Sequence, residues 1–117
     1  MRIVYVAAPY RAPTTWEREC NIQSARRVGA EVAKLGGFPL IPHSNSAHMD
    51  GLCDDAFWLS GTLELLRRSD AVVLGPRWEQ SSGARAEKNE AERLGIPVFD
   101  NLPDLEWWLK NVPAKVA

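Results

Sequence analysis

Short apolar runs that alternate with helical patterns restrict this chain to a small set of folds. Residues 2–8 and 71–74 are near-continuous apolar runs, which are typical of strands buried on both faces of a parallel sheet. Residues 38–41 and 96–99 are shorter runs of the same kind. Helical patterns separate these runs, so the chain is predicted to be an α/β protein. We expect a three-layer α/β/α sandwich, Rossmann- or flavodoxin-like, with a parallel sheet of four to five strands.

The predicted helices are bounded by capping residues. Thr14 and Glu17 have the spacing of a capping box, so a long helix is expected to begin there and to stop at Gly36. Asp54 or Asp55 could cap a second helix, which ends near residues 69–70. The remaining helices are expected over residues 83–94 and 104–110.

The strand order predicted for this pattern is 2-1-3-4. That order would place the loops after Ala8 and Leu74 side by side at a switch point, where open α/β sheets bind their ligands. Residues 42–55 have turn chemistry throughout and are expected to form one long loop. A loop of this length in a small domain is usually functional or mobile.

Composition excludes several classes of partner. The 117 residues are expected to form one domain, 1–117, and the net charge of -1 offers no basic field for a nucleic-acid polymer. The first apolar run is too short for a signal peptide or a membrane span. Cys20 and Cys53 have neither metal-ligand spacing nor a disulfide framework, so a reduced cytoplasmic setting is expected.

The stretch from Leu74 to Glu87 combines a strand end, an anion-friendly loop and a helix carrying a carboxylate. Glu87 would lie one turn into that helix, where the positive helix end favours its charged form. Such a carboxylate can act as a nucleophile at the anomeric carbon of a sugar. The alternative is a solvated helix acid of the kind common on protein surfaces.

Other side chains are expected around the same crevice. The backbone amides at Ser81, Ser82 and Gly83 would form a phosphate cradle, although Ser82 could be only an N-cap. Arg11, and more weakly Arg77 and Arg85, could hold a phosphate or carboxylate. Tyr10 is expected to face the crevice, and His43 is either a donor to the substrate or a structural histidine. Trp78 and Trp58 could stack on a base, with core packing as the alternative for Trp58.

Metal binding is not expected. His48 and Asp50 are two potential ligands in one flexible loop, which is too few for a metal site. We therefore expect neither a metal nor another cofactor.

Several motifs together resemble the nucleoside 2-deoxyribosyltransferase-like superfamily, which includes the 2'-deoxynucleoside 5'-monophosphate N-glycosidases. The resemblance covers about residues 2–99, and its most specific part is Gly83-x-x-x-Glu87 after the strand led by Asp70. The other matching segments are residues 5–11, Asn21 with Ala25, Pro42 with His43, Ala91, and residues 95–98.

The resemblance implies separate roles for these residues. Glu87 falls on the catalytic glutamate that attacks C1' and forms a covalent glycosyl-enzyme. Ser81 falls where nucleotide-acting members bind phosphate with a serine and the transferases have an aspartate. The first ligand loop falls on Ala8 to Arg11, and His43 falls on a histidine near the site. Asp70 and Tyr10 are the further catalytic candidates.

The chain departs from the family pattern at Thr62, where members commonly have an acid that helps to protonate the leaving base. The alternative sources of this acid are Asp50, Asp54 and Asp55 of the long loop. The first loop is also poorer in glycine and serine than is usual.

The leading hypothesis is an N-glycoside hydrolase or transferase acting on a (deoxy)nucleoside 5'-monophosphate or nucleoside. It is expected to form a homodimer or dimer of dimers, as members of the superfamily commonly do. The alternatives are a nucleotide-binding or sensor domain with weak or no catalysis, and a structural subunit with an empty crevice.

Overall fold

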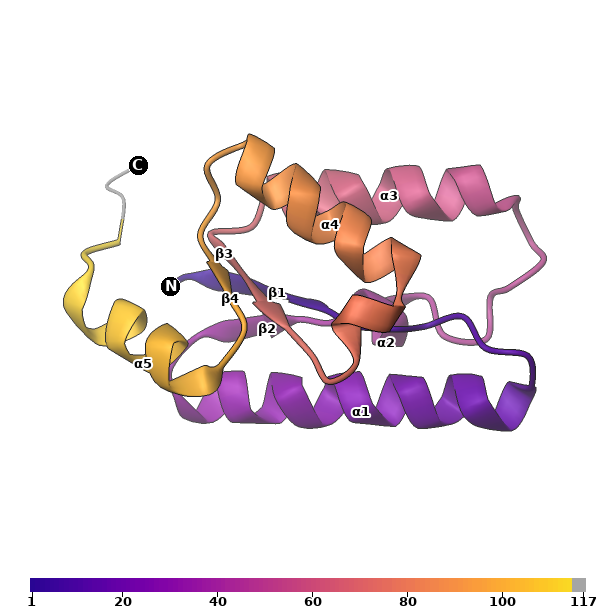
Figure 1. The fold of residues 1–117 in the computed structure, drawn as a ribbon, viewed down its shortest axis with the longest axis horizontal. Helices are drawn as coiled ribbons and strands as arrows, with labels where there is room; N and C mark the ends of the chain where they lie inside the picture. The colour runs from indigo at the N-terminus through magenta and orange to yellow at the C-terminus, as the bar shows by residue number, and fades with distance from the viewer. Residues whose placement is uncertain (115–117) are drawn as a thin grey trace.

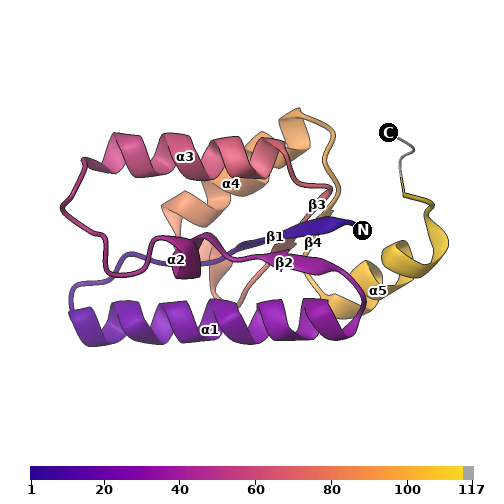
Figure 2. The same cartoon turned by 180° about the vertical axis from the view of Figure 1, so that it is seen from behind.

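A four-stranded parallel sheet forms the middle layer of the computed structural model, which describes residues 1–114. The strand order is β2-β1-β3-β4, as predicted, and all three strand pairs are parallel. The strands are β1 (Ile3–Ala7), β2 (Phe38–Leu40), β3 (Ala71–Leu74) and β4 (Val98–Phe99). Figure 1 shows this sheet between two layers of helices, and Figure 2 shows the same arrangement from behind.

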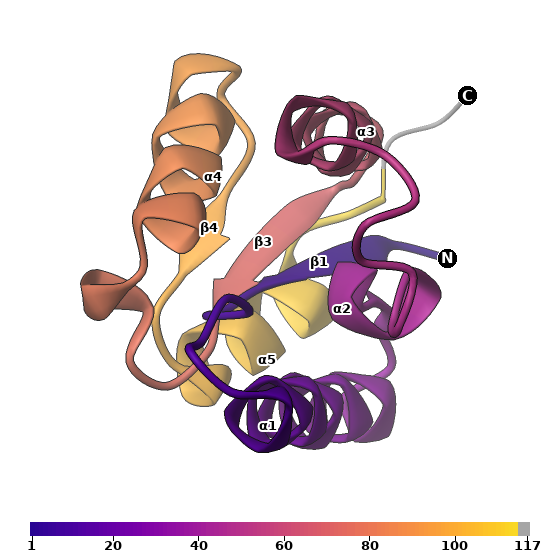
Figure 3. The same ribbon diagram turned by 90° about the vertical axis from the view of Figure 1, so that its right-hand side faces the viewer.

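Helices cover both faces of the sheet, so the predicted three-layer α/β/α sandwich is confirmed (Figure 3). The helices α1 (Thr15–Lys34) and α5 (Leu102–Asn111) cover one face. The helices α3 (Asp55–Arg67) and α4 (Ser82–Arg93) cover the other. Alternation along β1 sends Val4 and Val6 to the first face and Tyr5 to the second.

Local capping explains where the helices begin and end. The Thr14 side chain accepts a hydrogen bond from the Glu17 amide at 3.1 Å, and Gly36 follows α1 at a φ of 96°. Asp54 caps α3 by accepting from the Phe57 amide at 2.9 Å. Of the two capping residues predicted as alternatives, Asp54 and Asp55, the structure therefore has Asp54. These two capping contacts fix the starts of both helices, because they satisfy amides that have no partner inside the helix.

The expected long loop over residues 42–55 is wrong in its first part. Residues Pro42–Asn45 form a short helix, α2, in which Pro42 occupies the first turn. Proline suits that position because its fixed φ is helical and its missing N–H would be unpaired there. The 3-10 helix η1 (Trp78–Gln80) was also not predicted.

The two tryptophans of α5 have different environments. Trp108 packs beside Phe99 on the sheet, and the Arg2 guanidinium lies 4.3 Å from the centre of its ring. Trp107 is 63% exposed. Trp108 therefore covers the sheet, whereas Trp107 faces outward.

Gly75 connects the ends of β1 and β3 so closely that a side chain does not fit. Its amide donates to the Ala7 carbonyl at 2.8 Å, and a Cβ at Gly75 would lie 2.9 Å from the Ala8 Cβ. We expect Gly75→Ala to destabilise the protein by about 1–3 kcal/mol, because one of the two loops must shift. Gly61→Ala is the control, since a Cβ there meets nothing within 4 Å on a helix. Urea unfolding should show opposite signs for the two variants; equal effects would contradict this packing argument.

Within residues 1–114, no helix is long and apolar enough to cross a membrane.

Candidate functional site

A cavity of about 770 Å³ lies at the carboxyl ends of β1 and β3. Its walls come from the loop after β1, from α2, from the first half of α3, and from the first half of α4. This is the switch point where the sequence places the crevice. The volume is within the range of pockets that bind small molecules.

Glu87 is buried in the wall of this cavity and is only 7% exposed. The Tyr5 hydroxyl, from β1, donates a hydrogen bond to Glu87 Oε2. Tyr5 reaches it because the sheet face that carries Tyr5 is the face covered by α4. The alternative of a solvated helix acid is therefore wrong.

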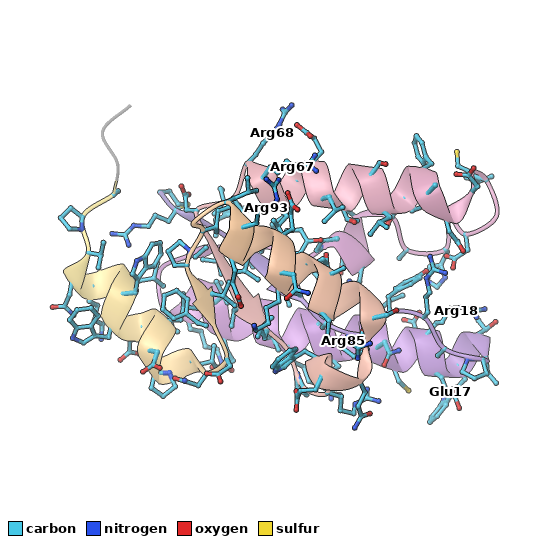
Figure 4. The ribbon with its side chains drawn as sticks, turned by 45° about the horizontal axis from the view of Figure 1, so that its top comes forward. Glu17, Arg18, Arg67, Arg68, Arg85 and Arg93 are labelled. Carbon is cyan, nitrogen blue, oxygen red and sulfur yellow. The ribbon has the colours of Figure 1, made fainter. Side chains whose placement is uncertain are left out.

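The other acids of α4 show what a surface carboxylate looks like in this helix. Glu90 pairs with Arg93 and, at 3.5 Å, with Arg67. Figure 4 shows these two arginines at the carboxyl ends of α4 and α3. Glu92 pairs with Lys88. Glu87 has no arginine or lysine partner within the described part of the chain, and its bond to Tyr5 is the exception among the acids of this helix.

Burial changes the proton affinity of the Glu87–Tyr5 pair. Desolvation raises the pKa of Glu87 to about 7, although the hydrogen bond from Tyr5 acts in the opposite direction. Desolvation, followed by the neighbouring Glu87 charge, raises the pKa of Tyr5 far above its usual range. Burial therefore opposes the ionised form of Glu87 that the helix start was expected to favour.

The start of α4 offers unpaired donors to the same cavity. Ser81 is the N-cap, since its side-chain oxygen accepts from the Ala84 amide at 3.1 Å. Ser82 therefore occupies the first helical position, not the cap suggested as its alternative role. Among residues 1–114, the amides of Ser82 and Gly83 have no backbone or side-chain acceptor. Both amides, and the Ser81 hydroxyl proton, remain available to an anion at the helix end.

His43 holds the loop after β1 in place. Its Nε2 lies 2.9 Å from the Ala8 carbonyl and 3.0 Å from the Pro9 carbonyl, so this nitrogen carries the proton and donates. Burial lowers the pKa of His43, although both carbonyls raise it. The structural alternative for His43 fits this geometry better than donation to a substrate, because its Nε2 proton is already engaged. Ala8 lines the cavity as predicted.

Tyr10 and Arg11 form the outer rim of the cavity. The Tyr10 hydroxyl donates to Asp50, and Arg11 pairs with Asp55 at 2.8 Å. Burial, followed by the hydrogen bond to Asp50, raises the pKa of Tyr10 to about 12. The rim therefore joins the first loop to the start of α3 and to the segment before it, through Asp50 and Asp55, which the sequence had proposed as substitutes for the missing acid.

Two predicted site residues lie elsewhere. Asp70 precedes β3, at the opposite end of the strand from the cavity, where its carboxylate accepts from the Ile3 amide at 2.7 Å. It fixes the start of the sheet and is not brought to Glu87. Trp78 packs against the buried cluster beneath α3 and α4, with the Lys88 ammonium 5.7 Å from its ring centre. Trp58 lines the cavity in its place.

The weaker arginine candidates also point to other partners. Arg77 donates to the Asn21 side chain at 3.0 Å, and Asn21 in turn donates to the Tyr10 carbonyl at 3.0 Å. Arg85 donates to the Glu79 carbonyl. Arg77 thereby ties the loop after β3 to the loop after β1, and neither arginine lines the cavity.

The middle of α3 supplies the remaining wall. Thr62 lines the cavity, and its hydroxyl donates to the Leu59 carbonyl at 3.1 Å. A hydrogen bond with the Thr62 side chain also lowers the pKa of Tyr5, against the larger effect of burial. Trp58 presents its indole to the cavity, and its Nε1 is buried without an acceptor among the described residues.

Sequence reasoning missed Tyr5 as a functional residue. The available signal was a phenol inside an otherwise aliphatic strand, because a buried hydroxyl requires a hydrogen-bond partner. Alternation along β1 would have directed it to one face, but the partner becomes known only when α4 is placed on that face. Metal binding has no support from geometry: residues 1–114 contain no group of three or more His, Cys, Asp or Glu side chains able to hold an ion.

Comparisons with known proteins agree with this architecture. The model of a family described as a domain of unknown function (DUF7768) matches residues 2–101. No match was found among curated proteins. The fold is similar to that of a 2-deoxyribosyltransferase from the psychrotolerant bacterium Bacillus psychrosaccharolyticus, with 18% identity and a TM-score of 0.58 over 86% of this chain and 75% of that chain. At this identity the likeness shows a shared fold.

Proposed function

The chain belongs to the family of domains of unknown function DUF7768, and for this member we propose cleavage of the base–sugar bond of a (deoxy)nucleoside 5'-monophosphate or nucleoside. The buried Glu87 carboxyl, held by Tyr5 in the wall of a ligand-sized cavity, carries this proposal. The activity is that of an N-glycoside hydrolase or transferase of the nucleoside 2-deoxyribosyltransferase-like superfamily.

Glu87 is the nucleophile of the proposed reaction. One carboxylate oxygen accepts from Tyr5, which leaves the other free to attack C1' of the sugar. The C1'–N bond breaks, and a glycosyl ester of Glu87 forms through an oxocarbenium-like transition state. A pKa of about 7 leaves a substantial fraction of Glu87 ionised at neutral pH.

The start of α4 binds the 5'-phosphate in this proposal. The free amides of Ser82 and Gly83 and the Ser81 hydroxyl are the donors. Gly83 and Glu87 are four residues apart in one helix, a rise of about 6 Å. This separation suits a sugar that places its phosphate at the helix end and its C1' beside Glu87.

A panel assay tests the proposal directly. The protein is incubated with ribo- and deoxyribonucleoside 5'-monophosphates of each common base, with nicotinamide mononucleotide, and with the matching nucleosides. Liberated base is measured by chromatography. We expect release from at least one phosphorylated substrate. Absence of release from every compound would reject N-glycoside cleavage.

Ser81→Asp tests the phosphate site while preserving the helix cap. Aspartate caps helices as well as serine does, so the fold should be retained. Its charge would repel the phosphate, and losing a hydrogen bond to a charged group costs about 1.5–3 kcal/mol. The KM of the phosphorylated substrate should therefore rise by roughly 10- to 100-fold, whereas any cleavage of the unphosphorylated nucleoside should not weaken. An equal change for both substrates would place the phosphate elsewhere.

A nucleotide-binding or sensor domain is the second candidate. Thr62 favours it, because a hydroxyl engaged with the Leu59 carbonyl replaces the acid of the resembled enzymes. Calorimetry with each nucleotide, followed by recovery of the ligand, separates the two functions. Tight binding with an intact ligand after long incubation would favour the sensor.

The assembly is proposed to be a homodimer or dimer of dimers of a single cytoplasmic domain. Exposed apolar side chains near the start of α3 support association: Leu52 is 71%, Phe57 56% and Leu59 44% exposed. Light scattering on the purified protein would give the subunit count.

A further inference from the structure

The leaving base presents a problem that the cavity does not solve for ordinary nucleotides. An adenine, cytosine or uracil departs as an anion unless an acid protonates it, and glycosidases usually provide a carboxylic acid for this purpose. At the position where the resembled enzymes have that acid, this chain has Thr62, which lines the cavity and donates its hydroxyl proton to the Leu59 carbonyl at 3.1 Å. An alcohol is far too weak an acid to replace a carboxyl group.

The carboxylates at the rim are engaged as acceptors. Asp55 pairs with the Arg11 guanidinium at 2.8 Å, and Asp50 accepts the proton of Tyr10. Both acids lie at the exposed mouth of the cavity, at the start of α3 and in the segment before it. As acceptors, neither offers a proton; Asp50 adds negative charge to the mouth, whereas the charge of Asp55 is balanced by Arg11.

The remaining protonated groups are held by other partners. The His43 Nε2 proton is shared by the Ala8 and Pro9 carbonyls, and the Tyr10 proton is directed at Asp50. Burial keeps His43 neutral by lowering its pKa. Among the residues described by the structure, the cavity therefore has no carboxylic acid or imidazolium, apart from the proposed nucleophile Glu87, to protonate a departing base.

The cavity does contain what attracts a flat cation. Trp58 and Tyr10 contribute aromatic rings to its wall. Arg11 and Arg18 also line the cavity, but Arg11 is paired with Asp55, whereas Asp50 accepts from the Tyr10 hydroxyl and has no ion-pair partner among the described residues. Aromatic faces and nearby carboxylates both favour a positively charged ring over a neutral one.

We propose that the substrate of this site is the 5'-phosphorylated N-glycoside of a cationic pyridinium base, of which nicotinamide mononucleotide is the representative. A base that is already positively charged leaves as a neutral molecule and needs no acid. This inference rests on the proposed function and specifies its substrate class. The cavity of about 770 Å³ has room for a mononucleotide.

The reaction balances without a further reactant except water. Glu87 forms a bond to C1' as the C1'–N1 bond breaks. The electron pair of the C1'–N1 bond stays on the pyridinium nitrogen, so nicotinamide leaves as a neutral molecule. Water then attacks C1', and the ester bond electrons return to Glu87. The water proton passes to solvent, giving ribose 5-phosphate, nicotinamide and one proton.

Competing substrates in one assay test the inference. The wild-type protein is given nicotinamide mononucleotide and, separately, AMP, CMP, UMP and their deoxy forms. We expect kcat/KM for nicotinamide release to exceed that for every ordinary base by about 100-fold or more, the usual contribution of a general acid. Release of ordinary bases at equal or higher efficiency would overturn the inference while leaving the proposed function intact. No release from any compound would overturn both.

Thr62→Asp provides the second arm. A carboxyl group at this position should raise cleavage of ordinary nucleotides by about tenfold or more, whereas nicotinamide release should not increase, because that step needs no acid. Thr62→Asn is the matched control, polar and similar in size but not acidic. An equal increase for nicotinamide and ordinary bases in Thr62→Asp would contradict the assignment, as would an increase in Thr62→Asn.

Discussion

Replacing Glu87 by glutamine is expected to lower base release by roughly 10⁴-fold or more, as is typical when a catalytic nucleophile is removed. Glutamine retains an oxygen that accepts from Tyr5, so the local hydrogen bond and the packing of α4 can persist. The substitution removes only the charge that the proposed reaction directs at C1'. The measurement is kcat/KM for the best substrate of the panel, at a pH where wild-type Glu87 is ionised.

Glu92→Gln is the matched control for this prediction. Glu92 belongs to the same helix, but it is exposed and paired with Lys88. Its replacement makes the same chemical change outside the cavity, and surface substitutions of this kind have small effects. Base release by Glu87→Gln within tenfold of the control would show that Glu87 is not the nucleophile.

The architecture was predictable because local signals agree with one another along most of the chain. Apolar runs placed the strands, and Thr14 and Gly36 marked the ends of α1 in the structure as in the sequence. The order β2-β1-β3-β4 follows from short connections and right-handed crossovers. The same reasoning located the crevice after Ala8 and Leu74, since parallel strands end at the same edge.

The chemistry of the site was less predictable because it depends on contacts between distant segments. Tyr5 and Glu87 are 82 residues apart, and only the packing of α4 on β1 brings them together. Sequence position suggested a charged Glu87 at a helix start, whereas burial dominates its pKa. Asp70 was misplaced for a related reason: it precedes its strand, and residues before and after a strand lie at opposite ends of the sheet.

Burial of Glu87 should also make the stability of the wild-type protein fall as pH rises. The pKa of this carboxyl is about 7 in the folded protein, against 4.5 for the hydrated carboxyl in the unfolded chain. The folded state therefore binds the proton more tightly, so the stabilisation is fully present below pH 4.5 and is lost as pH rises through about 7. A pKa difference of this size changes the free energy of unfolding by about 3 kcal/mol across this pH range.

His43 acts in the opposite direction and must be separated from Glu87. Its pKa is lowered by burial, so its contribution to stability is lost as pH falls through the usual range of histidine titration. The informative quantity is therefore the difference in unfolding free energy between wild type and Glu87→Gln, in which the histidine contribution cancels. Urea unfolding from pH 4 to pH 8 measures it for both proteins.

We expect Glu87→Gln to gain on the wild type by about 3 kcal/mol as pH rises across this window, because glutamine never ionises. The unfolding free energy of Glu87→Gln minus that of the wild type should therefore be larger at pH 8 than at pH 4. A pH-independent difference would mean that Glu87 is hydrated and titrates normally, contrary to its burial beside Tyr5. Such a gain in stability on loss of the carboxylate is the behaviour of a residue retained for chemistry at a cost to the fold.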